Sequence, residues 1–233
     1  MADSPPDRPH TESPSSARTE HGNDLHCKAL AHTIAAAERT TSSVLASPDL
    51  LLALAPQGYN ELELNKGLTL ATTAQSKFTA RQEALAVTKL ATKARDMAFD
   101  IAKKEFTEFQ TAIKANHRDT GLAGLGSSRP IPKQSAKFCA TAREAYNRGI
   151  QEPYVSILSN CGFNRQRLTK ALNVLDKLDT AERANENALS KVKVATETRD
   201  VAADVLVAWV TKLRTIAKIT LEDRPALLRM LKD

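Results

Sequence analysis

The stretch KLATKARDMAFD, residues 89–100, recurs in altered form as KVATETRDVAAD, residues 193–204. Seven of these twelve positions are identical. The same spacing of 104 residues aligns residues 58–117 with residues 162–221 without a gap. Similarity at one fixed spacing over such a length is typical of a repeated structural unit. The sequence therefore predicts that the chain contains two repeats of one fold element.

The core of each repeat is a long segment that is well suited to a helix. Residues 60–116 contain no Pro and only one Gly, Gly67. Alanines seven residues apart, followed by larger apolar residues, fall on one face of such a helix, and small residues at this spacing let two helices pack closely. The two lines are Ala84, Ala91, Ala98, Ala102, Phe106, Phe109 and Ile113, and Ala188, Ala195, Ala202, Leu206, Val210, Leu213 and Ala217. We expect a long coiled-coil-like helix in each repeat, with a hairpin that breaks near residues 72–82 as the alternative.

A short apolar segment with a Pro near its start precedes each long segment, and the two are separated by the sequence Gly–aromatic–Asn. This sequence is Gly58-Tyr59-Asn60 in the first repeat and Gly162-Phe163-Asn164 in the second. Gly is favoured at the left-handed position that ends a helix, and Asn is favoured as the cap that begins the next. We expect these residues to separate two helices, with Glu63 completing a capping box in the first repeat only.

These patterns predict an all-α, internally duplicated helical bundle. Each repeat is expected to contain a helix, a short helix and a long coiled-coil-like helix. Residues 1–23 are rich in Pro, Ser, Asp and Glu, which predicts a disordered tail. The repeats are expected at residues 24–118 and 136–233, joined by a linker at 119–135. We expect them to pack as one domain with their long helices antiparallel.

The composition excludes several classes of protein. Three Cys without a CxxC spacing do not predict a disulfide framework or a zinc site, and they are typical of a reducing compartment, so a cytoplasmic location is expected. No apolar run is long enough to span a membrane. No catalytic, cofactor-binding or metal-binding motif occurs, so we expect neither an enzyme nor a bound cofactor.

A charged stripe is kept in both repeats on the side of the long helix away from the alanines. We take it as the candidate interface, and it comprises Lys89, Thr92, Asp96 and Asp100, with Lys193, Thr196, Asp200 and Asp204. Two aspartates four residues apart repel each other on a helix, so a compensating charge from outside the helix is expected. A solvated surface is the plain alternative. Convergence of the four aspartates on a metal ion is a further alternative, although the Glu-x-x-His pairs of helical metal sites are absent.

The arginine inside each stripe, Arg95 in the first repeat and Arg199 in the second, lies at the edge of the alanine line. Its stem can cover the apolar surface while its guanidinium pairs with a carboxylate. A structural role is therefore expected for both.

The absence of catalytic motifs, the long helices and the duplication favour a non-enzymatic structural or interaction protein. Its expected partner is itself, as a homo-oligomer or filament, or another protein. One alternative is binding of nucleic acid through the basic excess, since the net charge is +6. The candidate contacts for that alternative are Arg118, Arg129, Lys133, Lys137, Arg165 and Arg167. The other alternative is a helical carboxylate metalloprotein that uses the four aspartates.

Overall fold

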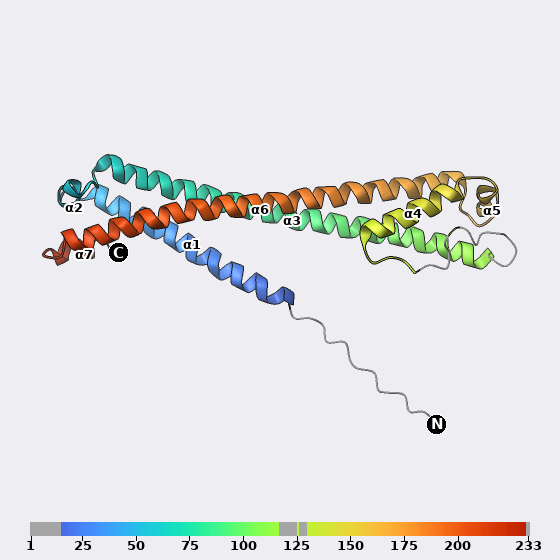
Figure 1. Ribbon diagram of the computed structural model, residues 1–233, viewed down its shortest axis with the longest axis horizontal. Coiled ribbons are helices and arrows are strands. Elements are labelled where there is room, and N and C mark those ends of the chain that lie inside the picture. The colour runs from blue at the N-terminus through green and yellow to red at the C-terminus, as the bar shows by residue number, and fades with distance from the viewer. Residues whose placement is uncertain (1–14, 117–124, 126–129, 232–233) are drawn as a thin grey trace, which may run out of the picture. The chain divides into compact units, whose positions relative to one another are not determined.

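The computed structural model describes the backbone of residues 15–116, 125 and 130–231, and the side chains of residues 29–115, 125 and 130–231. These residues form an all-α fold in which no strand occurs (Figure 1). The predicted tail, residues 1–23, lies outside the described residues as far as residue 14, and the backbone is helical from Ser15. The helices are α1 (Ser15–Ala46), α2 (Pro48–Leu54), the 3-10 turn η1 (Ala55–Gln57), α3 (Glu61–Asn116), α4 (Ser135–Gly149), α5 (Tyr154–Asn160), α6 (Arg165–Thr220) and α7 (Pro225–Arg229).

The two long segments are each one continuous helix of 56 residues. The bounds of α6 are those of α3 displaced by 104 residues at both ends. Residues 72–82 lie inside α3, so the alternative of a hairpin broken there is wrong. The spacing seen in the sequence is therefore a spacing of secondary structure.

The turn that precedes each long helix has the same backbone geometry in both repeats. Gly58 has φ 90° and Gly162 has φ 80°, which is the left-handed region that favours glycine. The N–H of the following aromatic residue donates to the carbonyl five residues back, at 3.2 Å in the first repeat and 2.9 Å in the second. This pairing is the Schellman motif, which satisfies carbonyls left free at a helix end. The predicted role of Gly–aromatic–Asn as a break between helices is confirmed.

The asparagine after each turn caps the long helix, as predicted. Asn60 Oδ1 accepts a hydrogen bond from the backbone N–H of Glu63 at 3.0 Å, and Asn164 Oδ1 accepts one from that of Arg167 at 2.9 Å. The predicted capping box in the first repeat is only half formed. The Glu63 carboxylate instead accepts a hydrogen bond from Trp209 Nε1 at 2.9 Å, so a contact with α6 replaces the local one.

The chain divides into two compact units that cut across the predicted repeats. Unit 1 comprises residues 1–80 and 196–233, and unit 2 comprises residues 81–195. The long helices pack together (Figure 1), and both unit boundaries fall inside them. Within unit 2 they run antiparallel, because residue 92 of α3 contacts residue 185 of α6 and residue 108 contacts residue 167. The start of one long helix therefore shares a unit with the end of the other.

The core of each unit includes the large apolar residues predicted on the inner face of the long helices. In unit 1, Leu206, Val210 and Leu213 of α6 are buried with residues of α1, α2 and α3. In unit 2, Phe106 and Phe109 of α3 are buried with Phe138 and Tyr146 of α4. The alanines at 84, 91, 98, 195 and 202 are half-buried rather than fully buried. Ala102, Ala188 and Ala217 of the same lines are buried, so the predicted line of small residues is buried in part.

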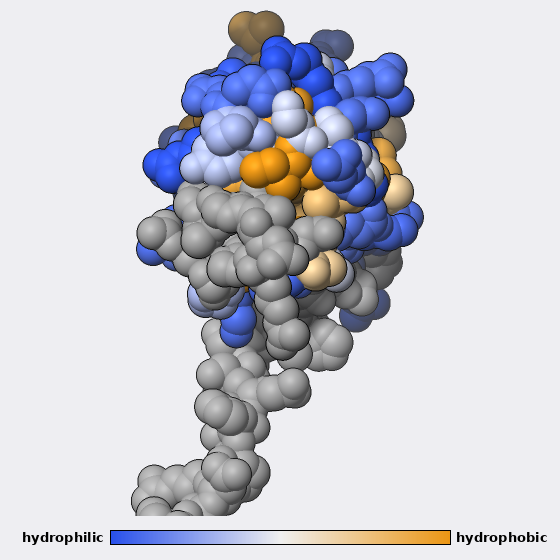
Figure 2. Space-filling model, turned by 90° about the vertical axis from the view of Figure 1, so that its right-hand side faces the viewer, coloured by the Kyte–Doolittle hydropathy of each residue, from blue (hydrophilic) through white to orange (hydrophobic). Residues whose placement is uncertain are grey.

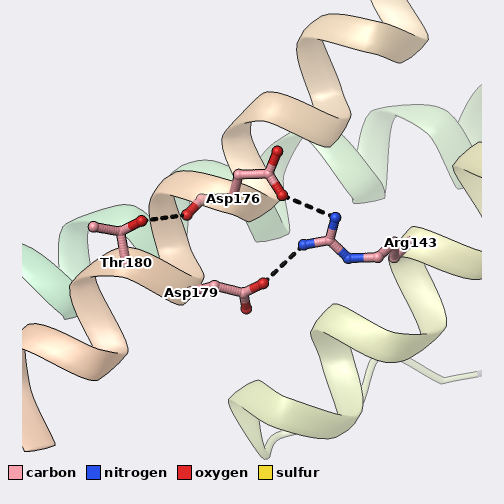
Figure 3. Close-up of polar contacts among 4 residues, drawn as sticks. All are labelled: Arg143, Asp176, Asp179 and Thr180. Carbon is pink, nitrogen blue, oxygen red and sulfur yellow. Dashed lines mark hydrogen bonds and ion pairs between the residues drawn. The ribbon is translucent and has the colours of Figure 1, made fainter.

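An ion-paired arginine fixes α4 to α6 inside unit 2. Arg143 of α4 donates to Asp176 at 2.8 Å and to Asp179 at 2.7 Å, from two different guanidinium nitrogens (Figure 3). The hydrogen bond to Asp176 is the main reason that the pKa of Arg143 lies above its ordinary value. Thr180 lies one turn along α6 and donates to the backbone carbonyl of Asp176 at 2.8 Å. One arginine on α4 therefore binds two successive acidic positions on α6.

Candidate interaction surface

The predicted charged stripe does not form one site. On α3, Lys89, Asp96 and Asp100 are exposed and belong to unit 2. On α6, Lys193 also belongs to unit 2, whereas residues 196, 200 and 204 belong to unit 1. Lys193 and Asp204 are exposed, and Thr196 and Asp200 are partly buried. The residues of the charged stripe are therefore described separately for each unit.

Thr92 does not share the outward position expected for it. Its hydroxyl donates to Asn185 Oδ1 of α6 at 2.9 Å, and Asn185 is buried. The residue that corresponds to Asn185 in the first repeat is Arg81, which is also buried. Both long helices thus bury a polar side chain at the same repeat position. Thr92 is part of the packing of α3 against α6 in unit 2.

The compensating charge for Asp96 and Asp200 comes from the preceding residue in the same helix. Arg95 donates to Asp96 Oδ1 from Nη2 at 2.6 Å and from Nε at 3.0 Å, and this pairing raises the pKa of Arg95. Arg199, which is 4% exposed, donates to Asp200 in the same way, with its Nε at 2.8 Å. The expected structural role of the two arginines is supported, and no external charge is needed for these two aspartates.

Asp100 and Lys93, which lies two helical turns before it on α3, are in a different situation. Both side chains are exposed on α3. Within the described part of the chain, neither forms a hydrogen bond or an ion pair. They are seven residues apart on one side of α3, so they present two opposite charges two helical turns apart.

An apolar stripe that was not predicted from the sequence lies on the outside of α3. Four of its large side chains are highly exposed, with exposed fractions of 54% for Val87, 70% for Leu90, 57% for Met97 and 54% for Ile101. Ala94 lies between them and is also exposed. We call these five residues the α3 apolar stripe. Their spacing of three and four residues in alternation is the heptad pattern of a coiled-coil seam, and it was the signal that could have revealed them.

The corresponding positions of α6 keep part of this pattern. Val194, in unit 2, is 58% exposed. Val201 and Val205, in unit 1, are 65% and 47% exposed. The positions that match Val87 and Ala94 carry Lys191 and Thr198, so the α6 pattern is less apolar than the α3 apolar stripe.

The described surface has hollows in unit 1. Leu70 and Lys77 of α3 and Val201 and Val205 of α6 line an open groove in unit 1. A second hollow in unit 1, under α7, is lined by Leu213, Arg214, Lys218 and Leu228, among others. Seen from the end at which α5 lies, the described surface is mainly hydrophilic around a small apolar area (Figure 2).

The groups that could bind a metal ion are dispersed over the described residues. Nowhere among them do three or more His, Cys, Asp or Glu side chains gather in a metal-binding arrangement. Cys139 and Cys161 are free thiols. Burial raises the pKa of Cys139 to about 11, which keeps that thiol protonated at neutral pH.

None of the described helices has an apolar stretch of sufficient length and low charge to cross a membrane.

The residues proposed for nucleic-acid contact are in three different situations. Arg118 and Arg129 lie outside the described residues. Lys133, Lys137 and Arg165 are exposed. Arg167 is engaged within unit 2, where it donates to Glu108 at 2.6 Å and its guanidinium lies 3.9 Å from the centre of the Phe163 ring.

Comparison of the chain with protein-family models, with curated proteins and with solved structures finds no match.

Proposed function

We propose that the chain is a non-enzymatic structural protein that self-associates through the outer face of a long helix. The observation that carries the proposal is the α3 apolar stripe. Scattered single apolar residues are normal on a protein surface, but a contiguous line with heptad spacing is typical of a helix that packs against another helix. The stripe lies outside the intramolecular contact between α3 and α6, so it is available for a second one.

The size of the stripe predicts a modest affinity. Full burial of a large aliphatic side chain contributes about 1.5–3 kcal/mol, and these side chains are roughly half exposed, so each contributes about 1 kcal/mol. Eight such side chains from two molecules contribute about 8 kcal/mol, against an association cost of about 4–15 kcal/mol. At the lowest cost the balance is about −4 kcal/mol, which corresponds to a Kd of about 1 mM, so the stripe on its own supports a weak complex that forms only at high concentration.

The other functions considered from the sequence have less support. For nucleic-acid binding, Arg167 is committed to an ion pair and a cation–π contact. For a carboxylate metal site, Asp96 and Asp200 are each paired with the preceding arginine. No described observation favours either function over self-association.

The test is the molecular mass in solution, measured by sedimentation velocity and light scattering from micromolar to millimolar concentrations. We expect the average mass to rise from that of a monomer towards that of an oligomer as the concentration increases. Negative-stain microscopy of the concentrated sample then shows whether the assembly is closed or filamentous. A monomer at every concentration would refute the proposal.

A further inference from the structure

We infer that residues 90–101 of the α3 apolar stripe pair with the same residues of a second molecule, antiparallel, about a two-fold axis between residues 95 and 96, with Val87 opposite Lys104 at the edge of the contact. This inference rests on the proposed self-association and specifies the surface, the partner and the direction of pairing. The whole stripe, residues 87–101, belongs to unit 2. Its geometry is that of one continuous helix.

Assigning heptad positions to the stripe identifies the residues on either side of it. With Val87, Ala94 and Ile101 at position a, Leu90 and Met97 fall at position d. Position e then holds Ala91 and Ala98, which are half-buried on the side that faces the core of unit 2. Small residues there let a second helix approach closely.

Position g, on the solvent side of the stripe, holds Lys93 and Asp100. Both are exposed and, among the described residues, both lack an ion-pair partner. In an antiparallel coiled coil, g positions of the two helices face each other. When Leu90 faces Ile101 and Ala94 faces Met97, Lys93 of each molecule faces Asp100 of the other. The pairing thus joins four charges into two intermolecular ion pairs related by the two-fold axis.

A parallel pairing of the same stripe is less favourable. In a parallel coiled coil, a g position faces the e position five residues further along the partner helix. Asp100 would then face Glu105 of the second molecule, and Lys93 would face Ala98. Like charges that face each other are destabilising, so the charges select the antiparallel direction.

Pairing through α6 is also less favourable. The α6 residues that correspond to Lys93 and Asp100 are Glu197 and Asp204, which are both acidic. Antiparallel pairing of two α6 helices would place these carboxylates opposite each other. Pairing of α3 with α6 would form one ion pair and one repulsive pair. The α3 helix is therefore the one whose flanking charges complement themselves.

The direction of pairing is tested by exchanging charges in the full-length protein. The Lys93→Glu and Asp100→Lys variants each place like charges opposite each other twice, so we expect each to weaken self-association about tenfold. When the two variants are mixed, a dimer of one molecule of each contains both ion pairs again. The double variant also contains both ion pairs in its own homodimer. We expect sedimentation velocity to show restored association in both cases. Failure of both to restore it would overturn the antiparallel pairing.

The surface is tested with a matched pair of variants. Met97→Asp introduces a charge into the α3 apolar stripe, and Val201→Asp introduces the same charge at the corresponding position of α6. Because both side chains are exposed in the monomer, circular dichroism should show an unchanged fold. We expect Met97→Asp to weaken association more than a hundredfold and Val201→Asp to leave it within about threefold.

The two possible failures are distinguishable. Loss of association with Val201→Asp but not with Met97→Asp would overturn the pairing through α3 while leaving the proposed self-association in place. A wild-type protein that remains monomeric at every concentration would overturn both.

Discussion

The two units differ where the start of one long helix meets the end of the other. In unit 1, Glu63 of α3 accepts a hydrogen bond from the indole of Trp209, whose ring also lies edge to face with Tyr59. That ring lies directly against the α3 backbone, because a Cβ atom added to Gly67 would lie 2.1 Å from Trp209 Cη2. The contact is therefore a ring packed on a glycine.

In unit 2, the residues 104 positions away form a contact of another kind. Arg167, in place of Glu63, forms ion pairs with Glu108 at 2.6 Å and with Glu105 at 3.8 Å. Glu105 stands where unit 1 has Trp209, and Ala171 stands where unit 1 has Gly67. Both units therefore share one backbone frame, in which an aromatic contact has been exchanged for an ionic one.

The comparison separates the features that both units share from those that differ between them. The turn with its left-handed glycine and its asparagine cap is the same in both units. The side chains that connect the two long helices after this turn differ between the units. Glycine at position 67 follows from the large ring that it faces, and without that ring the position holds alanine.

The largest effect is expected from removal of the ring. Trp209→Ala should lower the free energy of unfolding by about 3–5 kcal/mol, because a large buried side chain is replaced by a cavity. The matched change in unit 2, Glu105→Ala, should cost less than about 1 kcal/mol, since it removes a long and partly exposed ion pair. Chemical denaturation measures both, and hydrogen exchange shows whether the loss is confined to unit 1. Equal losses would show that the two contacts do not differ in strength.

The next effect concerns Gly67. Gly67→Ala gains about 1 kcal/mol of helix propensity, but the displaced indole costs about 1–3 kcal/mol and loses its hydrogen bond to Glu63. We therefore expect a net destabilisation of about 1–2 kcal/mol. In a Trp209→Leu background the same substitution should become neutral or stabilising. Destabilisation of the same size in both backgrounds would mean that the ring is not the cause.

A smaller effect is expected from Arg167. Arg167→Ala removes the contact with the Phe163 ring and the pair with Glu108, and because the side chain is 37% exposed we expect a loss of about 1 kcal/mol. Arg167→Lys keeps the charge but not the planar group, and should recover part of the loss. Thermal unfolding at low and high salt measures the ionic share, which salt should diminish. A loss independent of salt in both variants would assign the effect to packing alone.

The smallest effect is a dependence on pH. The hydrogen bond from Trp209 is the main reason that the pKa of Glu63 lies below its ordinary value of 4.5. Because the pKa is lowered by folding, the stabilisation is fully present above pH 4.5 and is lost as the pH falls through the lowered pKa. Trp209 is the single tryptophan of the sequence, so its fluorescence should change on acidification in the wild type and not in Glu63→Gln. A titration that persists in the variant would assign the change to another group.

Much of the frame could be predicted because it depends on local chemistry. The glycine that ends one helix and the asparagine that begins the next act within a few residues of themselves, so the sequence is enough to place them. The continuity of α3 and the burial of Phe106 and Phe109 follow from the absence of Pro and from helical periodicity.

The candidate surface could be predicted only in part. The charged stripe and the alanine line mark two opposite faces of the helix, and the α3 apolar stripe lies between them, beside the alanine line. The pairing of Arg95 with Asp96 is a choice of side-chain rotamer between adjacent residues, which residue spacing does not determine. Glu63 does not complete the predicted capping box because its carboxylate accepts a hydrogen bond from Trp209 instead. Trp209 is 146 residues away in the sequence, so the local residue pattern does not reveal this contact.

The position of the unit boundaries has a consequence for synthesis on the ribosome. Unit 2 is a single run of 115 residues, so it can fold as soon as that run has emerged, whereas unit 1 joins residues 1–80 to residues 196–233. At about 5–20 residues per second, the 140 residues from the end of that first part to the end of α6 take about 7–28 s to translate. During this interval, the unit 1 core lacks its α6 residues, which include Leu206 and Leu213. The first part of unit 1 is thus exposed to chaperones and to misassembly for longer than unit 2, although it is translated before unit 2.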